Sequence, residues 1–300
     1  DSEGQYLKNI LAKKFKLDPK KIILGSGSDQ IFELICKAFL NKNDEVIVSE
    51  FSFIIYRIYS KICGAKVRYA KEHNFKVSVE NILSQVNRKT KIVFLANPNN
   101  PTGTILQRKD LLKLRKKLRS NILLVVDDAY FEYVLDKGYS SGIDLFRNSK
   151  NVIITRTFSK IYGLAGLRVG WGYGPNNLIN ALNEIKPPFN INRAALSTAA
   201  ASIKDSNWLK KEVKHVNKWT NIFFKKFGTL GIATNISNAN FLLINFNKIK
   251  KDSKKIFFKF AKAGILLRKM DVYKIRNSLR VTIGNEKENK KFIKILGKIL

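Results

Sequence analysis

The sequence predicts an α/β protein, in which helices flank both faces of a mostly parallel central sheet and a smaller C-terminal α+β domain follows. Two observations lead to this fold class. Short apolar segments typical of strands alternate with segments of helical period through the first two thirds of the chain. After KPPFNINR (186–193) this alternation stops. Strands that alternate with helices form parallel sheets, which bind ligands at the carboxyl ends of their strands.

The expected strands of the large domain are short and rich in apolar residues, as strands buried on both faces must be. They are Lys21–Leu24, Glu45–Val48, Ala65–Tyr69, Lys91–Ala96, Ile122–Asp127, Val152–Thr155 and Arg168–Gly172. The helices expected between them are Asp29–Leu40, Phe53–Ile62, Val79–Val86 and Gln107–Leu118. In Asp29–Leu40, apolar residues recur at the i, i+3, i+4 spacing of a helix with one buried face.

The C-terminal part begins with a long helical stretch, from about Arg193 to Phe227, which we expect to break near Asp205. The expected strands beyond it are Phe241–Asn245, Gly264–Leu267 and Leu279–Ile283, and the expected helices are Ser253–Ala263 and Glu286–Leu300. We place the domain boundary inside the long helical stretch. This predicts a large domain over residues 1–215 and a small domain over residues 216–300.

Composition excludes several classes of protein. A hydrophobic content of 45% in 300 residues excludes a disordered chain, and no apolar run reaches the ~18 residues of a membrane span. The first residues lack the pattern of a signal peptide, and two widely spaced cysteines suit a reducing compartment, so we expect a cytoplasmic protein. With only two histidines, far apart, no metal site is expected.

The net charge of +33 raises the alternative of a basic nucleic-acid-binding protein. Lysines occur in nearly every block of ten residues, and no zinc-finger, RRM or homeodomain pattern is present. We therefore favour a general compositional bias towards lysine over a nucleic-acid partner. A salt-sensitive shift of DNA would be needed to support the alternative.

Three segments carry candidate ligand-binding residues after strands. In ILGSGSDQIFELI (23–35), a Gly/Ser turn opens a helix at Ser28 and Asp29, where free N–H groups can bind a phosphate. In ANPNNPTGTIL (96–106), Asn100 offers an amide in a rigid turn, and in ILLVVDDAYFEY (122–133), Asp127 and Tyr130 follow an apolar strand. Each has a structural alternative, because Ser28, Asp29 or Asp127 can cap a helix and the prolines can serve a plain connector.

The segment TRTFSKIYGLAGLRVGW (155–171) holds a candidate nucleophile, Lys160, which is its only ammonium side chain. Thr157, Ser159 and Arg168 are suitable phosphate ligands, and Lys160 stands among aromatic and apolar residues that favour an amine nucleophile over a solvated charge. The combined requirements describe one ligand, with a phosphate, a ring nitrogen that needs a carboxylate, a ring oxygen that needs amide and phenol donors, and an aldehyde. Pyridoxal 5'-phosphate meets all of them.

On these motifs, together with EFSFIIY (50–56) and LRVTIG (279–284), the sequence resembles the fold-type I aminotransferases. Within them it is similar to the histidinol-phosphate aminotransferases of class II. The motifs occur in the family's order over essentially the whole chain. The resemblance implies an aspartate aminotransferase-like fold, a pyridoxal-phosphate-binding large domain, and a homodimer.

The same resemblance implies the role of each site residue. Lys160 would form the Schiff base with the cofactor and move protons, Asp127 would bind the ring nitrogen, and Asn100 and Tyr130 would bind the ring oxygen. Phe53 would stack on the ring, and the structural alternative is a core aromatic of the helix at 53–62. Arg280 would hold the anion of the substrate, Asn100 would also bind the substrate, and Arg268 would be a second anion contact.

The implied reaction is transamination between histidinol phosphate and 2-oxoglutarate, giving imidazole acetol phosphate and glutamate in histidine biosynthesis. The partners would thus be a small-molecule amino donor and a 2-oxo acid. Because the motifs serve the cofactor more than the substrate, a threonine-phosphate decarboxylase and an aromatic or broad amino-acid aminotransferase stay open as alternatives.

Three departures from the family pattern accompany the resemblance. The family's DEAY is DDAY here, which we expect to leave Asp127 unaffected, and Phe51 stands where relatives have a proline, a change that we expect to be tolerated. Relatives also carry a Tyr-Pro pair upstream of the point where DSEGQYL begins. Its tyrosine reaches the cofactor phosphate in the neighbouring subunit, so we expect the sequence to be partial.

Overall fold

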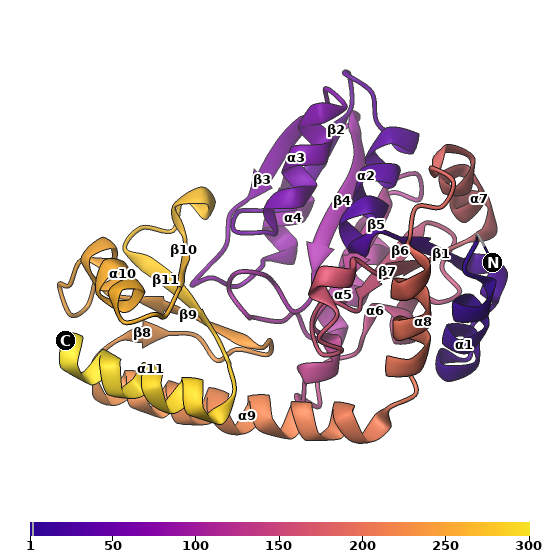
Figure 1. The fold of residues 1–300 in the computed structure, drawn as a ribbon. Helices are drawn as coiled ribbons and strands as arrows, with labels where there is room; N and C mark the ends of the chain where they lie inside the picture. Colours follow the sequence, from indigo (N-terminus) through magenta and orange to yellow (C-terminus); the bar gives the residue numbers. More distant parts are fainter. Residues whose placement is uncertain (2) are drawn as a thin grey trace.

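Two sheets of unequal size organise the protein, which we describe from a computed structural model covering residue 1 and residues 3–300 (Figure 1). The large sheet has seven strands in the order β1-β7-β6-β5-β4-β2-β3. Their bounds are β1 Ile22–Gly25, β2 Glu45–Ser49, β3 Lys66–Ala70, β4 Thr90–Ala96, β5 Leu123–Asp127, β6 Val152–Thr157 and β7 Gly170–Tyr173. Strands β2 to β6 pair in parallel, whereas β7 is antiparallel to both β1 and β6. The mostly parallel sheet that the sequence predicts is confirmed.

Helices cover both faces of this sheet. They are α1 Gln5–Phe15, α2 Gly27–Phe39, α3 Ile54–Ile62, α4 Val79–Ser84, α5 Arg108–Lys117, α6 Gly142–Phe146, α7 Asn176–Ile185 and α8 Arg193–Ser202. Apolar residues of α2, α3 and α7 pack on one face, and those of α1, α4, α5, α6 and α8 pack on the other. Neighbouring residues of a strand, such as Val93 and Phe94 in β4, therefore belong to opposite core clusters. This double burial explains why the strands are apolar throughout.

The small domain contains a four-stranded sheet in the order β10-β11-β9-β8. Its strands are β8 Ala233–Thr234, β9 Phe241–Asn245, β10 Arg268–Lys269 and β11 Ser278–Thr282, and its helices are α10 Ser253–Lys262 and α11 Glu286–Ile299. Helix α9, Ser206–Thr229, runs beneath both parts of the molecule (Figure 1). Aromatic rings from α9, α10 and α11 meet around Phe292, which stacks on Phe260 at 5.0 Å. They supply the core of the small domain.

The expected break in the long helical stretch is confirmed. Helix α8 ends at Ser202, and Asp205 begins α9 by accepting a hydrogen bond from the backbone N–H of Trp208 at 2.8 Å. Such a side-chain cap satisfies an N–H group that the first helical turn leaves free. The position of the cap residue was therefore readable from the sequence.

Two expected strands begin in the wrong place. Arg168 has a φ of 55°, a left-handed conformation that no strand permits, so β7 begins only at Gly170. In the small domain, Gly264 follows α10 and has a φ of 73°, which is not a strand conformation. The strand that we expected at Gly264–Leu267 lies instead at Arg268–Lys269. Elements α1, α6, α7 and β8 were not expected from the sequence. None of the helices in the described part of the chain is both long enough and apolar enough to cross a membrane.

Candidate active site

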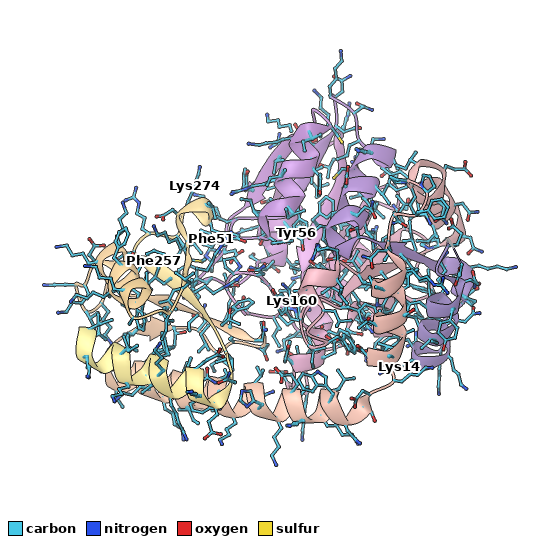
Figure 2. The ribbon with its side chains drawn as sticks, in the orientation of Figure 1. Lys14, Phe51, Tyr56, Lys160, Phe257 and Lys274 are labelled. Carbon is cyan, nitrogen blue, oxygen red and sulfur yellow. The ribbon has the colours of Figure 1, made fainter. Side chains whose placement is uncertain are left out.

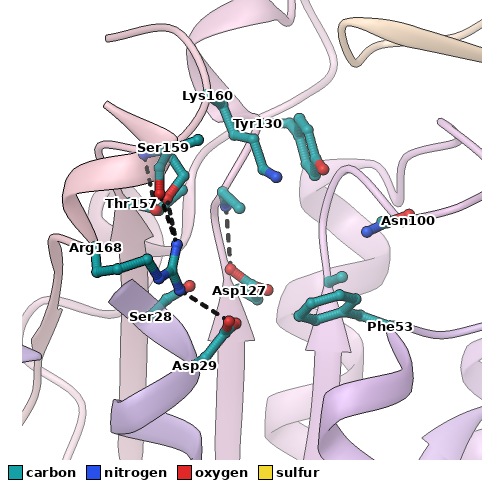
Figure 3. A pocket seen from close by; sticks show the side chains of 13 residues that line it. Ser28, Asp29, Phe53, Asn100, Asp127, Tyr130, Thr157, Ser159, Lys160 and Arg168 are labelled. Atoms are coloured by element: carbon teal, nitrogen blue, oxygen red, sulfur yellow. Dashed lines mark hydrogen bonds and ion pairs between the residues drawn. The ribbon is translucent and has the colours of Figure 1, made fainter. Parts of the chain in front are cut away.

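A pocket lies where the carboxyl ends of β4, β5 and β6 meet the N-terminus of α2 (Figure 3). Its lining consists of Ser28, Asp29, Phe53, Ala96, Asn100, Asp127, Ala129, Tyr130, Thr157, Ser159, Lys160, Ala165 and Arg168. Every residue that the sequence predicts to contact the cofactor is in this set. The parallel sheet brings them together because the carboxyl ends of its strands share one edge.

One end of the pocket is built to receive an anion. Arg168 donates to Asp29 Oδ2 at 3.0 Å and to Ser159 Oγ at 3.3 Å, and Figure 3 shows these side chains gathered around the start of α2. The backbone N–H of Ser159 donates to Thr157 Oγ1 at 3.0 Å. Free N–H groups and the dipole of α2 favour a phosphate at this place, and the Arg168 guanidinium can bind it with two N–H groups.

Two glycines make room for this anion-binding end. Gly27 has a φ of 72°, and a Cβ there would lie 2.2 Å from Arg168 Nη2. A Cβ on Gly170, the first residue of β7, would lie 2.2 Å from the backbone nitrogen of Ser28. The sequence analysis did not single out Gly170. Gly170 stands two residues after Arg168, and this spacing is the one signal in the sequence that could have linked it to the anion-binding end. The fold is needed to show that β7 passes beside the N-terminus of α2.

Asp127 lies at the floor of the pocket, at the end of β5, and is only 4% exposed. Its Oδ2 accepts a hydrogen bond from the Tyr56 hydroxyl at 2.6 Å, and its Oδ1 accepts from Thr155 Oγ1 and the Ala129 N–H, each at 3.2 Å. Burial raises the pKa of Asp127 to about 6, against the lowering effect of the Tyr56 and Thr155 hydrogen bonds. The sequence analysis missed Tyr56 and Thr155, because nothing in their local sequence points to Asp127.

Lys160 follows β6 and points into the pocket above Asp127 (Figure 3). Its Nζ lies 5.4 Å from the centre of the Tyr130 ring, which in turn packs edge-on against Phe241 of β9 at 5.2 Å. Within the described part of the chain, Lys160 forms no ion pair with a carboxylate. An amine held beside a buried carboxylate and a phenol is suited to attack a carbonyl and to transfer protons.

The second carboxylate of DDAY serves a different part of the protein. Asp128 accepts a hydrogen bond from the Gly142 N–H at 2.9 Å and pairs with Arg156 at 3.4 Å, and both side chains are almost fully buried. It does not belong to the pocket lining, and the hydrogen bonds of Asp127 do not involve it. This geometry agrees with the expectation that the shorter carboxylate leaves Asp127 unaffected.

The small domain brings Arg280 to the edge of the pocket. Arg280 Nη1 donates to Asn100 Oδ1 at 2.5 Å, and its guanidinium lies 4.5 Å from the centre of the Phe241 ring. Its Nε is buried without a hydrogen-bond partner in the described part of the chain. Arg268 lies directly opposite Arg280 on the neighbouring strand and is exposed. The two expected anion contacts are therefore adjacent, and Arg280 contacts a residue of the pocket lining.

The donor set of the pocket fits pyridoxal phosphate. Ser28, Ser159 and Arg168 offer hydroxyl and guanidinium donors for the phosphate, and Asp127 offers a carboxylate for the ring nitrogen. Asn100 and Tyr130 offer donors for the ring oxygen, and Lys160 offers an amine for the aldehyde. A metal is a poor match for this chemistry, and the described residues contain no group of three His, Cys, Asp or Glu side chains that could hold one.

Comparison with known proteins identifies the family. The family model for aminotransferase class I and II matches residues 4–296. The chain belongs to this aminotransferase family. It is 52% identical to the histidinol-phosphate aminotransferase of Pelagibacter ubique (strain HTCC1062), over 98% of this chain and 82% of that protein. It is 38% identical to the histidinol-phosphate aminotransferase of Maricaulis maris (strain MCS10), over 99% of this chain and 82% of that protein.

A solved structure shows the same aminotransferase fold. The histidinol-phosphate aminotransferase of Sinorhizobium meliloti, crystallised with pyridoxal-5'-phosphate, matches with a TM-score of 0.91 at 24% identity, covering all of this chain and 82% of that one. The predicted aminotransferase membership and the fold type are thus confirmed. At this identity, the solved structure supports the fold and not the substrate.

Proposed function

We propose that this chain is a pyridoxal-phosphate-dependent aminotransferase that transfers the amino group of histidinol phosphate to 2-oxoglutarate. One observation above all supports it, namely that Lys160, Asp127 and Arg168 line a single pocket in a chain 52% identical to a histidinol-phosphate aminotransferase. The reaction, which belongs to histidine biosynthesis, would interconvert this pair of substrates with imidazole acetol phosphate and glutamate.

The main polar and aromatic side chains of the pocket then have distinct tasks. Ser28, Ser159 and Arg168, with the N–H groups at the start of α2, bind the phosphate and hold the cofactor in place. Asp127, as a carboxylate, keeps a proton on the ring nitrogen. Phe53 lies beside the pocket floor (Figure 3), where its side chain would pack against the ring. When bound, the cofactor supplies an aldehyde and a protonated ring that can accept electrons from the substrate α-carbon.

The remaining residues handle the substrate. The amine of Lys160 points into the pocket, where it would remove the proton from the α-carbon of the substrate and later return one. Asn100 and Tyr130 donate hydrogen bonds to the ring oxygen. Arg280 binds the anionic group of each substrate in turn, through a guanidinium whose Nε has no partner and whose Nη1 rests on Asn100. Arg268, opposite Arg280, would add a second positive charge for a phosphorylated substrate.

The first test uses absorbance of the purified protein before and after borohydride. The wild type is expected to bind the cofactor with a visible absorbance band and to retain it covalently after reduction. Lys160→Ala is expected to bind it without covalent retention and to lose activity by ~10³-fold or more. A wild type that stays colourless with added pyridoxal phosphate would contradict the cofactor assignment.

The substrate is tested separately, by single-turnover conversion of histidinol phosphate, phosphothreonine and phenylalanine. We expect histidinol phosphate to react fastest. Reaction of phosphothreonine alone, with release of carbon dioxide, would instead support a decarboxylase.

The proposal includes a homodimer in the cytoplasm and a domain boundary near residue 215, inside α9. Support for the dimer comes from Tyr6 and Phe189, which are 61% and 75% exposed and line one hollow beside Leu196. Exposed aromatic rings around one hollow are typical of protein interfaces. Light scattering of the purified protein measures its mass directly, and a monomer at micromolar concentration would contradict the dimer.

A further inference from the structure

Tyr56 stands out among the buried groups to which the reaction above assigns no task. It lies on α3, three residues after Phe53, and its side chain is fully buried inside the large domain (Figure 2). Its hydroxyl donates to Asp127 Oδ2 at 2.6 Å. This is the shortest of the three hydrogen bonds to that carboxylate, since the bonds from Thr155 and Ala129 are 3.2 Å long.

Aromatic packing holds the Tyr56 ring in one orientation. It stacks on Phe94 of β4 with the ring centres 4.9 Å apart and the planes 5° from parallel. Phe32 meets it edge-on at 4.9 Å, and Phe53 meets it edge-on at 5.7 Å. Because three rings surround it, the phenol can neither rotate away nor exchange its partner for water. The same ring also buttresses Phe53, which we assign to the face of the cofactor.

The charges around Asp127 make this hydrogen bond important. Burial favours the protonated acid, and Asp29 on α2 adds repulsion, whereas Tyr56 is the largest influence that lowers the pKa. The other titratable groups near Asp127 are Asp128 beside it, and Tyr130, Lys160 and Arg168 across the pocket. Burial and Asp127 raise the pKa of Tyr56 well above its usual range, so its hydroxyl stays a donor at all working pH values.

We propose that Tyr56 is a positioning residue of this active site, whose hydroxyl keeps Asp127 ionised and orients its carboxylate for the ring nitrogen of the cofactor. With Oδ2 held by Tyr56 and Oδ1 held by Thr155 and Ala129, the carboxylate cannot turn in its pocket. This inference rests on the proposed function, since it needs a cofactor with a basic ring nitrogen.

The test compares Tyr56→Phe with a matched control. Phenylalanine keeps the ring packing and removes only the hydroxyl. Tyr133→Phe is the control, because Tyr133 is also buried but its hydroxyl has no hydrogen-bond partner in the described part of the chain. The dissociation constant of pyridoxal phosphate is measured from pH 5 to 8, by quenching of protein fluorescence. The cofactor itself also titrates in this pH range, but its titration is the same for every variant. It therefore cancels when the dissociation constants of two variants are compared at the same pH.

We expect Tyr56→Phe to weaken cofactor binding by roughly tenfold near pH 6, where Asp127 would be largely protonated, and to move the inflection of the pH profile upward by about one unit. Tyr133→Phe should leave the profile unchanged. In an Asp127→Asn background, Tyr56→Phe should have almost no effect, because Tyr56 acts through that carboxylate. An unchanged profile in Tyr56→Phe, or an equal loss in both backgrounds, would overturn the proposal.

A second measurement on the full chain without added cofactor separates this proposal from the proposed function. Asp127 has a raised pKa in the folded state, so it contributes stability at low pH that is lost as the pH rises towards 6. Denaturant unfolding measures the free energy of unfolding at each pH. In Tyr56→Phe this free energy should continue to fall above pH 6, whereas Tyr133→Phe should follow the wild type. If the wild type binds no pyridoxal phosphate, the proposed function fails, and identical unfolding profiles would overturn the role of Tyr56 as well.

Discussion

Arg280 of the small domain donates a hydrogen bond to Asn100 of the large domain, with 2.5 Å between Nη1 and Oδ1. This bond holds the Oδ1 acceptor of Asn100 towards Arg280, and the Nδ2 group of Asn100 is left to donate to a ligand in the pocket. The residue assigned to the substrate anion therefore also sets the orientation of a residue assigned to the cofactor. Other hydrogen bonds also join the two domains, among them that from the Asn238 N–H to Gly103 O at 2.8 Å.

Replacing Arg280 by alanine should remove the anion contact. We expect kcat/KM for histidinol phosphate and for 2-oxoglutarate to fall by about 100-fold, since losing one partner of a charge-assisted contact costs roughly 2–5 kcal/mol. Steady-state kinetics with both substrates measures this. Arg276→Ala is the matched control, because Arg276 is an exposed arginine that precedes the same strand. An equal effect of both substitutions would point to net charge and against a specific contact.

Gly170→Ala should damage the anion-binding end of the pocket. The new Cβ would lie 2.2 Å from the Ser28 nitrogen, so the start of α2 would have to move. Its N–H groups would then be displaced from the place where we expect the cofactor phosphate. We expect the dissociation constant of pyridoxal phosphate to rise by about tenfold or more, in line with roughly 1.4 kcal/mol per decade. Gly166→Ala serves as control, because a Cβ there meets nothing within 4 Å. If both variants bind the cofactor as the wild type does, the glycine has no role in shaping the site.

Asp128→Asn should destabilise the protein without touching the pocket. The substitution would remove the carboxylate that pairs with the buried Arg156 guanidinium, which lies 3.5 Å from the centre of the Phe131 ring. Breaking a buried ion pair costs about 3–5 kcal/mol, whereas an exposed pair contributes about 0–1 kcal/mol. Urea unfolding of Asp128→Asn beside Glu33→Gln, which breaks the exposed pair with Lys37, compares the two cases. A loss below 1 kcal/mol in Asp128→Asn would contradict the expectation.

Glu72 should make the free energy of unfolding depend on pH. Its carboxylate accepts hydrogen bonds from Ser49 Oγ at 2.7 Å and the Phe51 N–H at 3.2 Å, but burial still raises its pKa to about 7. A raised pKa of a carboxyl means that the folded state holds the proton more tightly. Stability is therefore present at low pH and is lost as the pH rises from about 4.5 to 7.

Glu72→Gln should remove that loss, because the amide cannot ionise. Between pH 5 and 8, the unfolding free energy of this variant should stay flatter than that of the wild type, by on the order of 2 kcal/mol. Glu80→Gln, which alters an exposed carboxylate, should keep the wild-type slope. Parallel slopes in the wild type and Glu72→Gln would show that Glu72 does not titrate in this range.

Much of the site could be read from the sequence because its residues stand beside strong local signals. Asn100 lies between two prolines, Asp127 ends a continuous apolar strand, and Lys160 follows the next strand. Placing these residues in a parallel sheet then requires only that the carboxyl ends of strands meet at one edge. The break at Asp205 was readable for the same reason, because capping is a local interaction.

What the sequence by itself determined is the alternation of strands and helices in the large domain, the residue types at the strand ends, and hence the chemistry of the ligand. What only the tertiary structure decided is which distant groups support them. Tyr56 contacts Asp127 across 71 positions and Arg280 contacts Asn100 across 180, and Gly170 meets the start of α2 through the pairing of β7 with β1. These contacts depend on packing between elements far apart in the chain. A periodic pattern in the sequence shows which face of an element is buried, but it does not show which distant residue that face contacts.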